Sequence, residues 1–434
     1  MKEFNKIIGY NAIKDELIQI SDSLKNTENY RKLGVKTPRG LMLYGDPGVG
    51  KTLMADALAK ASGRKTFVCR KDMPDGDFIN EIISVFEKAG EAEPSIVFLD
   101  DMDKFASGDP DYRNHEEYVT IQSCIDNSKD KDIFVLATAN DIDLLPVSLL
   151  RPGRFDRLIE VCNPDGDDAA NIMDHYIKQK KCVGEIDASV VARIMSGRSC
   201  AELETVINEA GIIAGYERSD VITMDHLTKA CLHTVHNIPN EVLNAGPLDI
   251  DIYDANSGQV RAIWHEAGHA VVAEALNPGR VNLVSVFSRR GGAGGYTSCN
   301  GSGCYDMIEK ELTDICIALA GKAALDQKFG VADVGVEQDL EIAANTVKSL
   351  LGDCCTNGFD LYTEKYRYSD NAKARLEQAA ARELDRLYRK TKEILIQNDE
   401  LLCGIAKALT KKRYLMASDI EKIRSGCRFV PAKL

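Results

Sequence analysis

The chain lacks a long apolar segment, a signal peptide and an excess of positive charge. No apolar run approaches the ~18 residues needed to cross a bilayer, so we expect no membrane segment. The N-terminus, MKEFNKIIGYNAIKDEL, is charged and amphipathic, unlike a secretory signal. Acidic residues outnumber basic ones by 67 to 54, and the net charge of −13 repels the phosphates of nucleic acids and anionic lipids. These absences predict a cytoplasmic protein with no nucleic-acid partner.

The cysteines lack the regular spacing of a disulfide framework. In a chain of 434 residues without a secretory signal, the 13 cysteines are expected to be reduced, mostly buried thiols. The segment CNGSGC (299–304) has one cysteine pair and no second pair, which favours a solvated loop over a metal site.

The length predicts two or three domains. Residues 1–164 alternate helical patterns with short apolar runs, as parallel strands with helical crossovers do. These runs lie at 40–45, 65–69, 95–100, 132–140 and 157–162. Residues 165–236 have helical periodicity only, and 237–250, with two prolines and a glycine, are expected to form a linker. Residues 251–434 are expected to be mostly helical, so the predicted fold class is α/β plus α.

A phosphate loop follows the first apolar run. GDPGVGKT, residues 45–52, fits the pattern G-x-x-x-x-G-K-[ST] and precedes a good helix, TLMADALAKASG. The glycines allow backbone N–H groups to surround a phosphate, Lys51 neutralises the β- and γ-phosphate oxygens, and the Thr52 hydroxyl ligates Mg²⁺. The predicted ATP-binding residues are Gly45, Asp46, Pro47, Gly48, Val49, Gly50, Lys51, Thr52 and Leu53.

Two carboxylates end the apolar run SIVFLDDMD (95–103). Asp100 is expected to hold Mg²⁺ through water, and Asp101 to polarise the water that attacks the phosphate. An acidic strand end is usually only a solvated edge, but its position beside a phosphate loop favours a catalytic role.

A metal-binding pattern occurs about two hundred residues downstream. In WHEAGHAVVAEAL (264–276), His265 and His269 are four residues apart, so that one helix face presents both imidazoles. This H-E-x-x-H spacing predicts a Zn²⁺ site with Glu266 as the general base for attack on a peptide carbonyl. Two hydrogen-bonded core histidines are the alternative.

Further motifs resemble those of AAA+ ATPases. VLATAND (135–141) followed by LLRPGRFDR (149–157) is similar to their second region of homology. The resemblance implies that Asn140 is the polar sensor of the γ-phosphate or of the attacking water. It also implies that Arg151 and Arg154 are arginine fingers that stabilise the transferring phosphoryl group in a neighbouring subunit. A finger acting in trans requires a ring, hence a homo-oligomer.

The order of phosphate loop, LLRPGRFDR and HEAGHA resembles the FtsH family of AAA+ zinc proteases, peptidase family M41, over nearly the whole chain. The resemblance implies a hexameric, ATP-dependent zinc metalloendopeptidase that degrades unfolded or loosely folded polypeptides, with Zn²⁺, ATP and Mg²⁺ as cofactors. Residues 1–164 and 165–236 then correspond to the large and lid domains of the ATPase, and 251–434 to the protease. Within ALAGKAALDQKFGVADVGVEQDLEIAANTVK, the resemblance places Asp339 as the third zinc ligand, where periodicity alone gives a helix N-cap.

The sequence departs from the family in several places. It starts directly at the ATPase, without the family's membrane segments, which suggests either a soluble relative or a removed anchor. Asp101 replaces a glutamate, so we expect slower activation of water. The aromatic of the substrate-gripping loop is missing from KDMPDGDF (71–78), where Met73 and Phe78 are the candidate substitutes. The adenine-side histidine falls at Tyr176, with His175 one place off.

Two other functions compete with an ATP-driven protease. One is a remodelling ATPase with an inactive protease domain, but such a protein has no chemical need for two histidines, Glu266 and Asp339 together. The other is a metallopeptidase that nucleotide only assembles, and the shortened acid Asp101 favours it.

Overall fold

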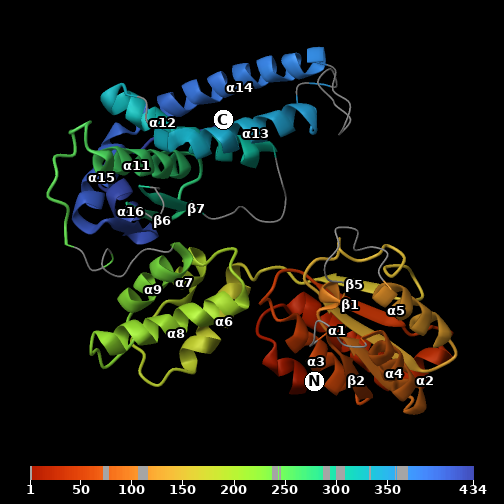
Figure 1. Cartoon of the computed structure of the whole chain (residues 1–434). Coiled ribbons are helices and arrows are strands. Elements are labelled where there is room, and N and C mark those ends of the chain that lie inside the picture. Colours follow the sequence, from red (N-terminus) through yellow and green to blue (C-terminus); the bar gives the residue numbers. More distant parts are fainter. Residues whose placement is uncertain are drawn as a thin grey trace. The chain divides into compact units, whose positions relative to one another are not determined.

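The computed structural model describes residues 2–71, 78–105, 116–236, 243, 246–286, 294–299, 308–331, 334–356, 358 and 370–434. It divides the chain into two compact units, Met1–Thr228 and Lys229–Leu434, each described below by itself (Figure 1). Met73 and residues 300–304 of CNGSGC lie outside the described residues. The predicted domain boundaries and linker stay predictions.

The first unit is built on a parallel sheet of five strands in the order β2-β3-β4-β1-β5. The strands are β1 (Gly40–Tyr44), β2 (Lys65–Cys69), β3 (Ser95–Leu99), β4 (Ile133–Ala139) and β5 (Arg157–Glu160). They coincide with the five apolar runs, and the predicted α/β class is confirmed. Every residue of β3 and β4 is buried, as expected for central strands covered on both faces.

The first helices of this unit precede the sheet strands or lie between them in the chain, and the later helices follow the last strand, β5, without further strands of the sheet. The first helices are η1 (Lys2–Lys6), α1 (Asn11–Lys25), α2 (Thr27–Lys32), α3 (Lys51–Ser62), α4 (Phe78–Glu91), η2 (Met102–Lys104) and α5 (Glu116–Asn127). The later helices are α6 (Gly166–Lys178), α7 (Ala188–Ile194), α8 (Cys200–Tyr216) and α9 (Met224–His236), which continues into the second unit. A capping box between Ser199 and Glu202 begins α8.

The second unit packs helices around one buried helix, α11 (Gly258–Leu276). Its other helices are α12 (Ile308–Phe329), η4 (Val334–Val336), α13 (Glu337–Gly352), α14 (Asp370–Gln397), α15 (Asp399–Lys412) and α16 (Ala417–Ser425). A small antiparallel sheet has the order β7-β6-β8, with β6 (Val281–Ser285), β7 (Tyr296–Cys299) and β8 (Tyr414–Met416). The single tryptophan, Trp264, is fully buried on α11 and donates its indole N–H to the Ile252 carbonyl at 2.7 Å.

The helix α11 contacts α12 more extensively than any other pair of elements in this unit, and small residues allow the approach. A Cβ at Gly268 would lie 2.7 Å from the Ala320 carbonyl oxygen of α12, so the two helix backbones lie too close together for any residue larger than glycine at this position. Among the helices within the described ranges, none has both the length and the apolar character that crossing a membrane requires.

Candidate nucleotide and metal sites

The phosphate loop lies at the carboxyl end of β1 and leads into α3. Its glycines adopt positive φ angles, 139° at Gly45, 84° at Gly48 and 100° at Gly50. A Cβ at residue 45 would also lie 2.2 Å from the Val161 carbonyl oxygen, so this position excludes every other residue type. The backbone geometry is therefore that of a turn whose N–H groups are available to a phosphate.

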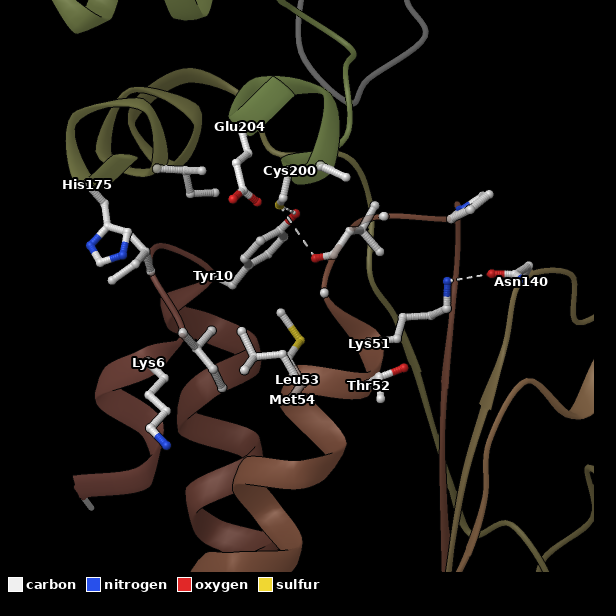
Figure 2. A pocket seen from close by; sticks show the side chains of 18 of the residues that line it. Lys6, Tyr10, Lys51, Thr52, Leu53, Met54, Asn140, His175, Cys200 and Glu204 are labelled. Atoms are coloured by element: carbon white, nitrogen blue, oxygen red, sulfur yellow. Dashed lines mark hydrogen bonds between the residues drawn. The ribbon is translucent and has the colours of Figure 1, made fainter. Parts of the chain in front are cut away.

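The loop lysine reaches the ends of two strands. The Lys51 ammonium donates to the carbonyls of Gly45 and Asp46, at 2.7 and 2.8 Å. It also donates to Asn140 Oδ1 at 2.9 Å (Figure 2). Burial lowers the pKa of Lys51. The predicted sensor and the predicted phosphate ligand thus meet in one place. Asp103 fixes Asn140, accepting its backbone N–H at 2.8 Å and its amide at 3.2 Å.

The first strand-end carboxylate, Asp100, is buried and its exposed fraction is 1%. Its Oδ1 accepts hydrogen bonds from Thr138 at 2.7 Å and from Thr52 at 3.2 Å. Burial alone would raise the pKa of the Asp100 carboxyl, but hydrogen bonds from Arg70 and Thr138 hold it below its usual range. An ionised carboxylate beside the Thr52 hydroxyl is an oxygen donor set that suits Mg²⁺.

The second carboxylate, Asp101, has a positive φ of 55°, which turns the chain away from the strand. Its N–H donates to Thr138 at 2.8 Å, and its Oδ2 accepts from Lys104 at 2.7 Å. Asp101 and Lys104 both line a cavity of ≈ 470 Å³, together with Lys51, Thr52, Leu53 and Asn140. Sequence reasoning missed Lys104, whose only signal was its place three residues after Asp101.

The metal-binding pattern lies on α11, where His265 and His269 face the same side. A carboxylate from α13 meets them there. Asp339 Oδ2 lies 3.1 Å from His265 Nε2 and 3.2 Å from His269 Nε2, and the two Nε2 atoms are 3.0 Å apart. The ligands of a tetrahedral Zn²⁺ lie about 3.3–3.5 Å apart, given its usual bond lengths. The three predicted ligands therefore form a cluster of the right size and chemistry for zinc.

Residues of α12 hold this cluster in place. His269 donates Nδ1–H to the Ile317 carbonyl at 2.6 Å, so that Nε2 is the ring nitrogen directed at His265 and Asp339. Gly321 lies against the other ligand, and a Cβ there would be 2.3 Å from His265 Cε1. The absent side chain at residue 321 thus makes room for the His265 imidazole. The sequence analysis included this segment but assigned no role to Gly321.

The predicted base, Glu266, points into the same region from α11 and is buried. Thr297 of β7 donates its hydroxyl to Glu266 Oε2 at 2.7 Å, and a Cβ at Gly295 would lie 2.3 Å from Glu266 Cγ. Burial raises the pKa of Glu266. For Asp339, hydrogen bonds from the two histidines outweigh burial and hold its pKa well below the usual range. The carboxylates therefore differ, one suited to accept a proton and one to bind a cation.

Comparison with known proteins agrees with both sites. Residues 41–163 match the ATPase family associated with various cellular activities (AAA), and residues 254–423 match peptidase family M41. An ATP-dependent zinc metalloprotease FtsH of Lachnoclostridium phytofermentans is 30% identical over 441 residues, which cover 96% of this chain and 74% of that protein. This chain belongs to the FtsH family.

Other FtsH proteins are similarly related. FtsH 1 of a Thermoanaerobacter species is 29% identical over 98% of this chain and 72% of its own length. The match to Helicobacter pylori FtsH, at 31% identity, covers 80% of this chain and 56% of that protein. The chain thus spans about half to three quarters of the length of these relatives. Membership of the family confirms the expected fold and the expected cofactors, Zn²⁺, ATP and Mg²⁺.

The two predicted arginine fingers of the FtsH-type LLRPGRFDR segment, Arg151 and Arg154, have different surroundings. Arg154 is held within its own chain, because Nη2 pairs with Asp126 Oδ2 at 2.7 Å and Nη1 donates to Gln122 at 3.0 Å. Hydrogen bonds from Arg154 and Lys129 lower the pKa of Asp126 to about 2. Arg151 is exposed. Neither arginine lines the nucleotide cavity of this chain.

Two departures from the FtsH pattern can now be placed. His175 and Tyr176 both line the nucleotide cavity, so the two candidates for the adenine side lie at the same site. Phe78 is buried, and its ring packs edge-on against that of Phe105 at 4.8 Å between centroids. Of the two candidates for the gripping residue, Met73 and Phe78, Phe78 is thus a core side chain whose ring is not presented to a threaded polypeptide.

Proposed function

We propose that this chain is a zinc endopeptidase driven by ATP hydrolysis, acting as a homohexameric ring on unfolded or loosely folded polypeptides. The observation that carries the proposal is the convergence of His265, His269 and Asp339 beside a buried glutamate, in a chain with a complete phosphate loop.

In the protease site, His265, His269 and Asp339 would hold Zn²⁺. When bound, zinc polarises a peptide carbonyl and makes water more acidic. Glu266 accepts the proton of the attacking water through Oε1, because the Thr297 hydroxyl occupies Oε2. The same carboxyl then donates this proton to the leaving amine.

In the nucleotide site, Lys51 would exchange the loop carbonyls for phosphate oxygens, and Thr52 with Asp100 would hold Mg²⁺. Asp101 orients the attacking water, and Asn140, fixed by Asp103, contacts the γ-phosphate or that water. Asp101 is one methylene shorter than the family's glutamate, so hydrolysis is expected to be slow.

The arginine finger is Arg151, which is exposed and reaches the neighbouring subunit's nucleotide, whereas Arg154 braces the segment through Asp126. Arg151→Ala is expected to bind ATP and to lose about 10³-fold or more in hydrolysis. Mixing it with Lys51→Ala subunits restores turnover at interfaces that pair an intact loop with an intact finger. No recovery in verified mixed rings contradicts a role in trans.

The preference for loosely folded substrates follows from the weak grip expected of MPDG (73–76), which has a flexible thioether where the family has an aromatic ring. A domain stable by about 5–15 kcal/mol refolds or slips before it is drawn in. Degradation rates of one tagged substrate in a stable and a destabilised form test this preference. Equal ATP-dependent rates contradict it.

One experiment separates this function from the two alternatives. ATP turnover and casein cleavage are measured with and without Zn²⁺ and ATP, in the wild type, Glu266→Gln and Lys51→Ala. We expect Glu266→Gln to keep ATP turnover and to lose cleavage by about 10²–10⁴-fold, since an amide cannot accept a proton. Lys51→Ala should lose both activities. Cleavage of casein by Glu266→Gln at the wild-type rate would contradict the protease mechanism.

A further inference from the structure

An arginine follows the strand next to the one that carries the magnesium-binding carboxylate. In the parallel pair β2 and β3, Cys69 is the register partner of Leu99, and the next residues are Arg70 and Asp100. The pairing continues beyond the strands, because the Asp100 N–H donates to the Cys69 carbonyl at 3.1 Å. Paired strands lie about 4.8 Å apart, so the backbone itself places the guanidinium within reach of the carboxylate.

The two oxygens of Asp100 have different partners. Oδ1 accepts from Thr138 and from Thr52, the hydroxyl of the phosphate loop. Oδ2 pairs with the Arg70 guanidinium. The carboxylate is 1% exposed, whereas the Arg70 side chain is 51% exposed. The Asp100 carboxylate is thus held in place by its surroundings, whereas the Arg70 side chain borders solvent and can move into it.

We propose that Arg70 sets the magnesium requirement of the nucleotide site by competing with Mg²⁺ for Asp100. The inference rests on the proposed binding of ATP and Mg²⁺ at this site. If Arg70 stays paired with Asp100 when Mg²⁺ binds, its charge neutralises the carboxylate and repels the ion. If Arg70 moves into solvent instead, Mg²⁺ binding has to break the Arg70–Asp100 ion pair. Both cases lower the affinity for Mg²⁺. Arg70 is a positioning residue here and takes no part in the transfer of phosphate.

The test is the Mg²⁺ dependence of nucleotide binding, which does not require hydrolysis. A fluorescent, non-hydrolysable ATP analogue is bound to the full chain, and Mg²⁺ is titrated. Solvent-exposed ion pairs contribute about 0.2–1 kcal/mol, a factor of about 1.4 to 5, so Arg70→Ala should lower the half-saturating Mg²⁺ concentration by a factor in this range. Arg70→Lys should lie near the wild type, and Arg70→Gln, which keeps length without charge, should behave as Arg70→Ala.

Lys65→Ala is the matched control, because it removes one exposed positive charge from the other end of the same strand. That end lies about 16 Å away, beyond the Debye length of about 8 Å at physiological salt, so no change is expected. In an Asp100→Asn background, Arg70→Ala should have no further effect. Thermal unfolding without Mg²⁺ confirms that each variant is folded.

An unchanged or higher Mg²⁺ requirement in both Arg70→Ala and Arg70→Gln would overturn the inference. A higher requirement would mean that Arg70 contacts the nucleotide instead. Failure of the proposed function gives a different result, since the wild-type chain would then not bind the analogue at any Mg²⁺ concentration.

Discussion

A single methyl group at Gly321 is expected to remove zinc from the protease site without unfolding the protein. Gly321 lies on α12, where an added Cβ would be 2.3 Å from both Cε1 and Nδ1 of His265. Ordinary van der Waals contact begins at 3.4 Å, so Gly321→Ala must displace the ring by about 1 Å. The interior of a buried helix pair offers no room for the methyl group itself to move.

The expected loss of zinc affinity follows from the small displacement of a ligand that a metal site tolerates. Metal–ligand distances hold to within about 0.2 Å, several times less than the required shift. Loss of residues that orient metal ligands typically weakens binding 10–100-fold, or by about 1.4–2.8 kcal/mol. We expect Gly321→Ala to reach or exceed this range. Alanine is favoured over glycine inside a helix by about 0.5–1 kcal/mol, so the metal-free fold should not be weakened by helix propensity.

The assay is zinc affinity, measured by competition with a chromophoric chelator, alongside ATP turnover and casein cleavage. Gly258→Ala is the matched control at the start of the ligand-bearing helix α11, where a Cβ meets only Arg261 Nη2 at 3.8 Å. We expect Gly321→Ala to lose zinc and cleavage while it keeps ATP turnover, and Gly258→Ala to keep all three. Wild-type zinc affinity in Gly321→Ala would refute the reasoning that residue 321 makes room for His265.

Three further substitutions separate binding from chemistry. In Gly295→Ala the new Cβ would lie 2.3 Å from Glu266 Cγ, so this variant should lose casein cleavage and keep its zinc in metal analysis. Loss of zinc would contradict this prediction. Asp339→Asn should release zinc, because the amide removes a negative charge, and full zinc content would exclude Asp339 as a ligand. Lys104→Ala frees the Asp101 carboxylate and should raise the kcat of ATP hydrolysis, whereas an unchanged or lower kcat would show that this ion pair is not limiting.

The sequence alone was most informative where one regular element carries the chemistry. The strands β1, β3 and β4 could be predicted because central parallel strands are buried on both faces and are therefore continuously apolar. The edge strands β2 and β5 are exposed or half-buried at most positions and only partly apolar, so their signal is weaker. His265 and His269 could be paired because a helix fixes the direction of residues four apart. The loop of residues 45–52 combines glycine backbone freedom with a lysine at a fixed offset.

Contacts between separate elements were not predictable in the same way. Nothing in the sequence brings Asp339 to the histidines without the family resemblance, because α13 and α11 are joined only by tertiary packing. The ion pair of Arg154 with Asp126 likewise depends on how α5 lies beside the segment at 149–157. Gly321 could be found only from its distance to an imidazole on another helix.

The two hydrolytic sites use their carboxylates in opposite ways, and the surroundings of each acid follow from its task. Asp100 pairs with Arg70 and Asp101 pairs with Lys104, and hydrogen bonds from Arg70 and Thr138 hold the pKa of Asp100 below its usual range. Glu266 is instead buried, with a neutral hydroxyl as its hydrogen-bond donor, and burial raises its pKa. Burial therefore dominates the proton affinity of Glu266 in the protease site, whereas ion pairs and hydrogen bonds hold the two carboxylates of the nucleotide site, although both reactions are hydrolyses.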